Sequence, residues 1–226
     1  MSNPTTKFHP ILFSTPMVQA ILEGKKTQTR RAVKPKYRNT DLVMKEFNSG
    51  RTKSLVEIQN DTPPPRKNDD GSTTHSVKAY HQVQSNYHVG DVLWVRETWQ
   101  IRDSRKPKEF FYKANDEMTC APWKPSIFMP KEACRIFLKV KSVRIERLMD
   151  ISEEDAQKEG VKILPNGSYR NYHEEEIEQN YMYTKEAKAS FKTLWESIYS
   201  IGRWEFNPYV FVYEFEKIEK PLDFVV

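Results

Sequence analysis

The chain of 226 residues has little cysteine, little glycine and no long hydrophobic run. Its two cysteines, Cys120 and Cys134, form no CxxC pair, and no histidine pair stands at zinc-binding spacing, so no metal is expected. The opening "MSNPTTKFHP" contains no apolar segment of a signal peptide, and no run of about 18 apolar residues occurs. We therefore expect a cytoplasmic protein with no membrane partner and no disulfide framework.

Several motifs that mark common enzyme classes are also missing. The sequence holds no GxGxxG, no GxxxxGK[ST] and no GxSxG, so the dinucleotide-binding, P-loop and serine-hydrolase classes have no support, and no cofactor is expected. None of the five histidines has a paired acid at an informative spacing. The seven glycines against 14 prolines favour rigid loops over flexible linkers.

Positive charge is in excess and gathers near the start. The formal net charge is +5, and "GKKTQTRRAVKPKYR", from Gly24 to Arg38, contains seven cations and no acid. Arginines beside hydroxyl groups are typical of phosphate binding through charge-assisted hydrogen bonds. A solvated basic strip is the alternative, so the pattern permits a nucleic-acid partner and leaves the choice open.

The hydrophobic patterns predict three helices and several strands. Helices are expected in "STPMVQAILEGKK", with Thr15 as N-cap, in "DISEEDAQKEGV", with Ser152 as N-cap, and in "TKEAKASFKTLWESIYS". Strands are expected in "TQTRRAV", "VGDVLWVRETWQI", "EFFYKAN", "KEACRIFLKVKSVRIERL" and "NPYVFVYEFEKI". The order of elements disfavours a doubly wound sheet and predicts an α+β fold, a small mixed β-barrel with about three flanking helices.

Two polar stretches interrupt this pattern. Residues of about 36–88 read as a polar insertion, with "NDTPPPRKNDDGSTTHS" as a loop and "LVMKEF" and "KSLVEIQ" as a candidate hairpin. A smaller insertion is expected at about 103–130. Because strong structure resumes after both, we expect one domain over residues 1–226.

Two groups of residues are candidates for chemistry. Glu159 precedes the predicted helix stop Gly160, where the helix dipole disfavours a carboxylate unless a cation holds it or its pKa is raised. Lys26 and Thr29 reach one pocket if the chain turns after the first helix, and face opposite sides if it is already a regular strand. A lysine–hydroxyl pair can carry out nucleophilic chemistry, with neutral lysine as the base.

These features occur together in a known family. "ILEGKKTQTRR", "VGDVLWVRETW" and "ISEEDAQKEG" resemble the ASCH domain (activating signal cointegrator homology) of the PUA-like β-barrel superfold, closest to the ASCH-domain proteins of bacteriophages and prophages. Similar segments are spread from Ile11 to Phe215 and include "KPSIFMPKEACRIFLKV", "FKTLWESI" and "NPYVFVYEF". The resemblance implies a PUA-like barrel with a cleft that binds RNA or nucleotides.

The resemblance also implies a catalytic site. A small bacterial member hydrolyses the acetyl amide on the exocyclic amine of acetylcytidine with a Lys and a Thr of a G-[RK]-K-T-x-T-x-R segment and a Glu at a helix end. These correspond here to Lys26, Thr29 and Glu159. The implied roles are attack by Thr29, proton removal by Lys26, and a Glu159 that relays protons or holds Lys26. Another member resembles a ribonuclease of single-stranded RNA.

Ligand-binding residues are implied in the same cleft: Lys25, Thr27, Arg30, Arg31, Trp94 and Arg96. Arg30 or Arg31 is expected to stabilise an oxyanion or hold phosphate. The leading hypothesis is a metal-independent hydrolase of a modified nucleoside or of RNA. The alternatives are a non-catalytic module that reads RNA or a modified base, and a phage accessory protein. Expected partners are RNA, single-stranded nucleic acid or a modified nucleoside, in the host cytoplasm if the chain is phage-encoded.

Overall fold

The chain divides into two compact units. The computed structural model describes residues 6–47, 52–60, 66–74, 80–102, 108–115, 122–173 and 183–225. One unit combines Met1–Arg31 with Tyr87–Val226, and the other is Ala32–Asn86. The second unit is thus inserted in the sequence of the first, and its limits lie close to those of the larger predicted insertion, about 36–88.

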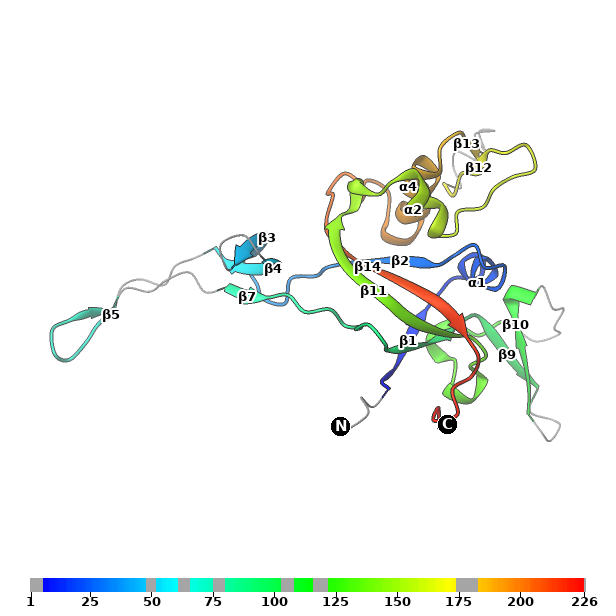
Figure 1. Ribbon diagram of the computed structural model, residues 1–226, viewed down its shortest axis with the longest axis horizontal. Helices are drawn as coiled ribbons and strands as arrows, with labels where there is room; N and C mark the ends of the chain where they lie inside the picture. Colours follow the sequence, from blue (N-terminus) through cyan, green and yellow to red (C-terminus); the bar gives the residue numbers. More distant parts are fainter. Residues whose placement is uncertain are drawn as a thin grey trace. The chain divides into compact units, whose positions relative to one another are not determined.

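The first unit is an α+β fold built on a five-stranded sheet with the strand order β1-β8-β11-β14-β2 (Figure 1). Its sheet strands are β1 (Phe8–Leu12), β2 (Gln28–Ala32), β8 (Val92–Arg96), β11 (Phe137–Arg147) and β14 (Tyr209–Ile218). Its helices are α1 (Thr15–Leu22), α2 (Glu153–Lys158) and α4 (Ala187–Tyr199), with short 3-10 helices at Lys113–Asn115, Ser126–Phe128, Lys131–Ala133 and Leu148–Asp150. Two small ladders join β9 (Trp99–Arg102) to β10 (Glu109–Tyr112) and β12 (Tyr169–Arg170) to β13 (Tyr183–Thr184).

The long antiparallel pair of β11 and β14 forms the centre of the sheet. The two strands run side by side over most of their length and curve together, with a register shift between Val140 and Ser142 (Figure 1). At one edge, β1 pairs in parallel with β8, and at the other edge β2 pairs with β14. Among the described residues no ladder joins the two edge strands, so a closed barrel stays a prediction.

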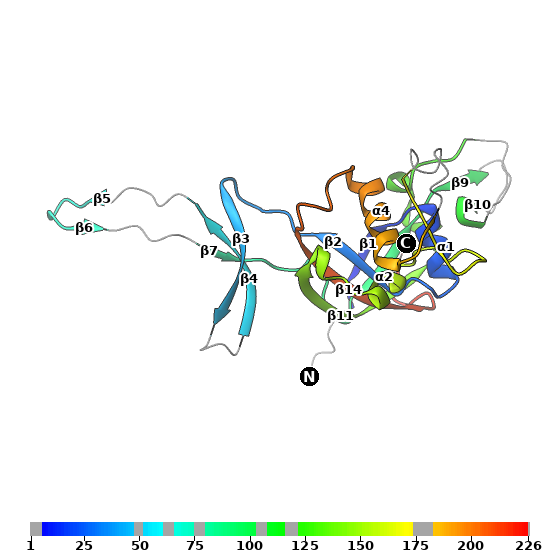
Figure 2. The ribbon, with the colours of Figure 1, turned by 90° about the horizontal axis from the view of Figure 1, so that it is seen from above.

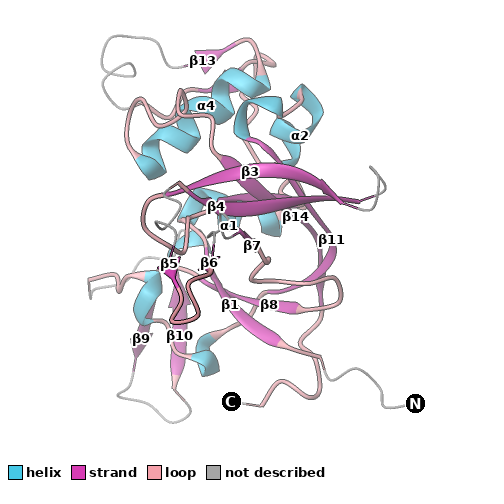
Figure 3. Ribbon diagram, turned by 90° about the vertical axis from the view of Figure 1, so that its left-hand side faces the viewer, coloured by secondary structure: helices cyan, strands magenta, loops and turns pink. Residues whose placement is uncertain are grey.

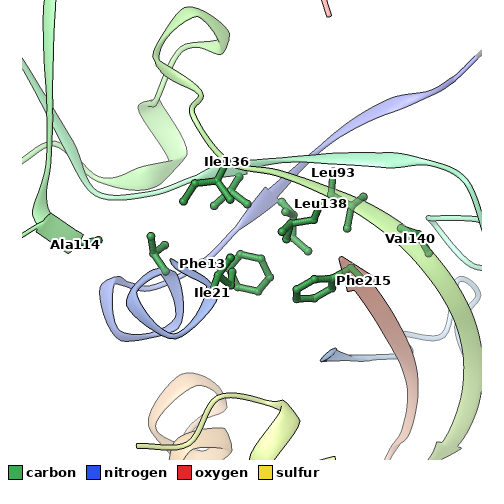
Figure 4. Close-up of a cluster of buried hydrophobic side chains, with 11 residues drawn as sticks. Phe13, Ile21, Leu93, Ala114, Ile136, Leu138, Val140 and Phe215 are labelled. Carbon is green, nitrogen blue, oxygen red and sulfur yellow. The ribbon is translucent and has the colours of Figure 1, made fainter. Parts of the chain in front are cut away.

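Helix α1 covers one face of the sheet through its buried residues Val18, Ala20 and Ile21. Its N-cap is Ser14, one residue before the predicted cap, and Pro16 lies in its first turn, where the missing N–H has no helical partner in any case. Figure 4 shows Phe13 and Ile21 facing side chains of β8, β11 and β14. This core cluster comprises Ile11, Phe13, Val18, Ile21, Leu93, Val95, Ala114, Ile136, Leu138, Val140 and Phe215.

Helices α2 and α4 pack together near the end of β11 that leads into α2 (Figure 3). The predicted cap of α2 is confirmed, because the Ser152 hydroxyl accepts a hydrogen bond from the N–H of Asp155 at 3.1 Å. Gly160 follows the helix with φ +83°, a conformation that favours glycine. Helix α4, which was predicted, buries Phe191 and Leu194, whereas Ile198 near its end is 46% exposed.

The second unit contains a three-stranded antiparallel sheet with the order β3-β4-β7 (Figure 2). Its strands are β3 (Thr40–Phe47), β4 (Thr52–Gln59) and β7 (Tyr80–Gln82), and a separate ladder joins β5 (Arg66–Lys67) to β6 (Thr73–Thr74). The predicted hairpin is confirmed, with Val43 opposite Val56. The described part of this polar insertion therefore has a sheet of its own, which its composition did not predict.

The smaller predicted insertion is described only in part. Residues 103–107 and 116–121 lie outside the described residues, and so does Cys120, whereas the predicted strand "EFFY" is β10. Cys134 is buried, and burial raises the pKa of its thiol to about 11. In the described part of the chain, no helix has both the length and the apolar character needed to cross a membrane.

Candidate active site

A buried lysine and a buried carboxylate meet between the start of β2 and the end of α2. The Lys26 ammonium donates hydrogen bonds to the Glu159 carboxylate oxygen Oε2 and to the Glu159 backbone oxygen, both at 2.8 Å. The side chain of Lys26 is fully buried and that of Glu159 is 2% exposed. Lysine is almost never buried without a partner, so this pair is the first indication of a specific role.

The backbone around the pair explains why these two residues meet. After α1 ends, Gly24 turns the chain with φ +73°, and the N–H of Lys26 donates back to the carbonyl of Ala20 at 3.0 Å. The next N–H, that of Thr27, donates to the carbonyl of Lys158 at 2.9 Å, which joins this turn to the end of α2. Lys26 therefore precedes the regular strand, and its side chain is free to turn toward Glu159.

Gly160 is required for this close approach. A Cβ atom at position 160 would lie 2.7 Å from the Cβ of Lys26 and 2.8 Å from that of Ala20, distances that real Cβ contacts essentially never show. The missing side chain of Gly160 thus allows two things: the positive φ that ends α2, and the close packing of the Lys26 side chain against the end of that helix.

The Lys26 ammonium is shifted toward its neutral form. Burial lowers its pKa below the ordinary value, because the charged form loses its hydration. The carboxylate of Glu159 opposes this effect and raises the pKa, whereas the guanidinium groups of Arg31 and Arg30 lower it further. The net direction is downward, which is the direction that a lysine needs to act as a base.

Arg30 donates a hydrogen bond to the other carboxylate oxygen of Glu159, Oε1, and belongs to a wider ionic network. A guanidinium has five N–H donors, and the structure shows five hydrogen bonds from Arg30: Nε and Nη2 to Glu146 Oε1 at 2.9 and 2.7 Å, Nη1 to Glu159 Oε1 at 2.9 Å and to Gln28 Oε1 at 3.4 Å, and Nη2 to Asp155 Oδ2 at 3.0 Å. Arg30 is 3% exposed. It has no free donor for an oxyanion or a phosphate, which corrects the role expected for it.

The network continues across β2, β11, β14 and α2. The amide of Gln28 donates to Asp155 Oδ1 and to Glu214 Oε1, each at 3.1 Å. Arg144 donates to Glu146 at 3.2 Å, to Glu214 at 3.0 Å and to Asp155. Three cations (Lys26, Arg30 and Arg144) thus face four carboxylates (Glu146, Asp155, Glu159 and Glu214), and their mutual pairing ties the helix end to three strands.

Thr29 and Arg31 lie on the other face of β2 from Arg30, because side chains alternate along a strand. Thr29 is 2% exposed, and among the described residues its hydroxyl has no hydrogen-bond partner. The Arg31 guanidinium donates to the carbonyl of Leu12 at 2.8 Å and lies 5.4 Å from the centroid of the Phe13 ring. The ammonium of Lys26 lies 5.6 Å from the centroid of the same ring. The two cations therefore share Phe13 as a neighbour, which brings Lys26 toward the face of β2 that carries Arg31.

Four other predicted site residues lie elsewhere. Lys25 is exposed and pairs with Glu23 at 2.6 Å, and Thr27 has an exposed side chain outside the cluster. Trp94 packs in a separate apolar cluster, whereas its neighbours Leu93 and Val95 belong to the cluster of Phe13.

Arg96 shares the strand face of Trp94, and its guanidinium lies 5.6 Å from the Trp94 ring. It donates to the carbonyls of Met129, at 3.1 Å, and Ile127. Trp94 and Arg96 therefore pack against the segment around residues 127–129. The sequence-based prediction placed both residues in the cleft of Lys26, and the structure does not bring them there.

The sequence-based prediction did not name the other residues of the ionic network, although the sequence contains a pattern that indicates them. Ser142, Arg144 and Glu146 alternate along β11 and share one face of it. Gln28 and Arg30 repeat the pattern on β2. Alternating polar residues on strands of one sheet indicate a polar face that another element must satisfy, and the acidic first turn of α2 supplies Asp155.

The described residues contain no group of histidine, cysteine, aspartate and glutamate side chains that is arranged to hold a metal ion. The carboxylates of the network are occupied by cations of the protein itself. Within the described chain the structure thus brings together a lysine of lowered pKa and a carboxylate that holds it, which are groups suited to proton transfer. The buried Thr29, the candidate nucleophile, lies on the face of β2 opposite Arg30. Comparisons of the chain with protein-family models, with curated proteins and with solved structures gave no match.

Proposed function

We propose that the chain is a metal-independent hydrolase with an ASCH-type, PUA-like fold, whose substrate is an acetylated cytidine nucleoside or RNA. One observation carries the proposal: Lys26 and Glu159, 133 residues apart, form a buried pair in which the lysine pKa is lowered. The resemblance implies that these two residues act together. Perturbed ionisable groups concentrate at functional sites, although structural ion networks also contain them.

The proposed reaction is transfer of an acyl group to Thr29. The hydroxyl oxygen attacks the amide carbonyl carbon while its proton passes to neutral Lys26. When the tetrahedral intermediate collapses, the carbon–nitrogen bond breaks and Lys26 returns the proton to the leaving amine. Water then hydrolyses the ester on Thr29, releases acetate and restores the hydroxyl. Glu159 positions Lys26, and Arg31 replaces Arg30 as the candidate donor to the oxyanion.

Access to the site is part of the proposal. Lys26 and Thr29 are each 2% exposed, so a substrate reaches them only if the segment around β2 and the end of α2 opens. This burial is the observation that favours the second candidate, a module that binds RNA or a modified base without chemistry and uses the Lys26 cluster as a structural network.

The test removes the Thr29 hydroxyl, because replacing Lys26 or Glu159 would also disturb the ionic network that supports the fold. The full chain is incubated with acetylcytidine and with short single-stranded RNA, and the products are followed by chromatography. Thr29→Val keeps the β-branched shape and removes the hydroxyl, so it should lower the rate by roughly three orders of magnitude or more. Thr29→Ser should keep part of the activity.

Thr27→Val is the matched control, because that side chain is exposed and lies outside the cluster. Its rate should equal that of the wild type, and thermal unfolding followed by circular dichroism should show that all three variants fold. Equal rates for Thr29→Val and the wild type would refute the mechanism. A wild type that turns over neither substrate would favour the non-catalytic candidate.

A further inference from the structure

A second site with a different character lies wholly within the inserted unit, Ala32–Asn86. A cleft of about 770 Å³ is lined there by two segments, one with Lys34, Lys36 and Tyr37 and the other with His81, Gln82 and Gln84. Glu57 of β4 lies between the two segments. None of these residues takes part in the Lys26 network.

Glu57 fixes the first segment. Its carboxylate accepts hydrogen bonds from the backbone N–H groups of Lys36 at 3.0 Å and Tyr37 at 2.6 Å, and from the hydroxyl of Thr40 at 2.5 Å. The Glu57 side chain is 3% exposed in spite of its charge. Because three donors occupy its two oxygens, Glu57 organises the chain that carries Lys36 and Tyr37 and leaves little capacity to bind a cation.

The same carboxylate places an aromatic pair at the cleft. Glu57 stands opposite His81 in the ladder of β4 and β7, and the rings of Tyr37 and His81 lie 4.6 Å apart with planes inclined at 34°. Tyr37 is 44% exposed, so part of its ring remains accessible. Because Glu57 fixes the backbone at Tyr37, the partly exposed ring is a preformed surface for stacking a flat ligand.

The cations beside this surface are not neutralised. Lys34 and Lys36 are exposed, and within the described residues neither has a carboxylate partner. The Lys36 ammonium lies 5.6 Å from the centroid of the Tyr37 ring. By contrast, Lys53 of the same unit pairs with Glu46 at 3.1 Å. The cleft thus combines a stacking surface, free positive charge and the amides of Gln82 and Gln84.

We propose that this cleft binds single-stranded nucleic acid, with a base stacked on Tyr37 and His81 and the adjoining phosphates at Lys34 and Lys36. Stacking surfaces flanked by cations are how proteins bind single strands with little sequence preference, because every base has a flat face and every linkage carries charge. Gln84 also lines the cleft and offers its amide to a base edge, whereas the amide nitrogen of Gln82 already donates to the Ser54 hydroxyl at 3.2 Å. This inference goes beyond the proposed hydrolase and does not depend on turnover.

The test is fluorescence anisotropy of a labelled ten-residue oligouridylate, titrated with the full chain at several salt concentrations. Tyr37→Ala should weaken binding by about tenfold or more, and Tyr37→Phe, which keeps the ring, should restore it. The double variant Lys34→Ala/Lys36→Ala should weaken binding and flatten its salt dependence by about 0.7 in log K per log salt for each phosphate that a lysine no longer neutralises.

Two controls match these changes. Lys53→Ala removes a paired lysine of the same unit, and Tyr183→Ala removes a tyrosine of the other unit that is 54% exposed. Both should bind like the wild type. The proposal is overturned if the oligonucleotide does not bind at low salt, if Tyr37→Ala binds as tightly as the wild type, or if the controls weaken binding as much as the cleft variants.

Discussion

Replacing Gly160 by alanine measures how tightly Lys26 is packed against the end of α2. The new Cβ would meet the Cβ atoms of Lys26 and Ala20 at 2.7 and 2.8 Å, and the residue would keep φ +83°. The left-handed backbone costs an alanine about 1–2 kcal/mol, and forcing a methyl group into a packed site costs about 1–3 kcal/mol more. The free energy of unfolding should therefore fall by about 2–5 kcal/mol.

Gly24 offers a matched control for this prediction. It also follows a helix, it has φ +73°, and a Cβ there would meet nothing within 4 Å. Gly24→Ala should therefore show the backbone cost alone, about 1–2 kcal/mol. Urea unfolding followed by tryptophan fluorescence and circular dichroism measures both variants. If they lose the same stability, the close contact with Lys26 has no energetic weight and the reasoning fails.

Three further predictions concern the charged residues. Glu159→Gln removes the carboxylate that raises the Lys26 pKa, so the acid-side limb of the pH–rate profile for acetylcytidine, where the rate rises as Lys26 becomes neutral, should move to lower pH; a limb that stays in place excludes Lys26 as the base. Arg30→Met leaves the carboxylates of its network without their shared guanidinium and should lower the free energy of unfolding by about 3–5 kcal/mol in urea titrations; a loss too small to resolve would contradict the proposed network. Burial alone raises the pKa of Asp155, but hydrogen bonds and the charges of Arg144 and Arg30 hold it below its ordinary value. The stability that Asp155 contributes is thus present above that ordinary value and lost as the pH falls through the lowered pKa, so melting temperatures of Asp155→Asn should fall less steeply with acid than those of the wild type.

Local patterns predicted most of the elements of the first unit. The Ser152 cap, the Gly160 stop and the β-branched run of β11 act within a few residues, and each appears in the structure as expected. The candidate hairpin of β3 and β4 was predicted within a stretch whose composition indicated a polar insertion, and the structure confirms it. The average polarity of a segment therefore does not exclude regular strands within it.

Local sequence patterns predicted much less of the candidate site. Arg30 and Glu159 meet over 129 residues of sequence, and no local pattern indicates which of many carboxylates an arginine contacts. Because side chains alternate along a strand, Trp94 lies on the opposite face of β8 from Leu93 and Val95, but alternation does not say which of the two faces is turned toward α1. The pairing of Lys26 with Glu159 was expected from the resemblance alone, because charge and spacing left both residues open to an exposed role.

The two residues that flank the inserted unit, Arg31 and Tyr87, both donate hydrogen bonds to strand β1. Arg31, just before the insertion, donates to the carbonyl of Leu12, and Tyr87, just after it, donates to that of Pro10 at 3.2 Å. The chain therefore leaves and re-enters the first unit beside β1, and each doubling of the length between such anchored points costs only about 0.6 kcal/mol of chain entropy. Because both anchors belong to the first unit, a change in the length of the insertion is expected to leave the strand order and the lysine cluster of that unit in place.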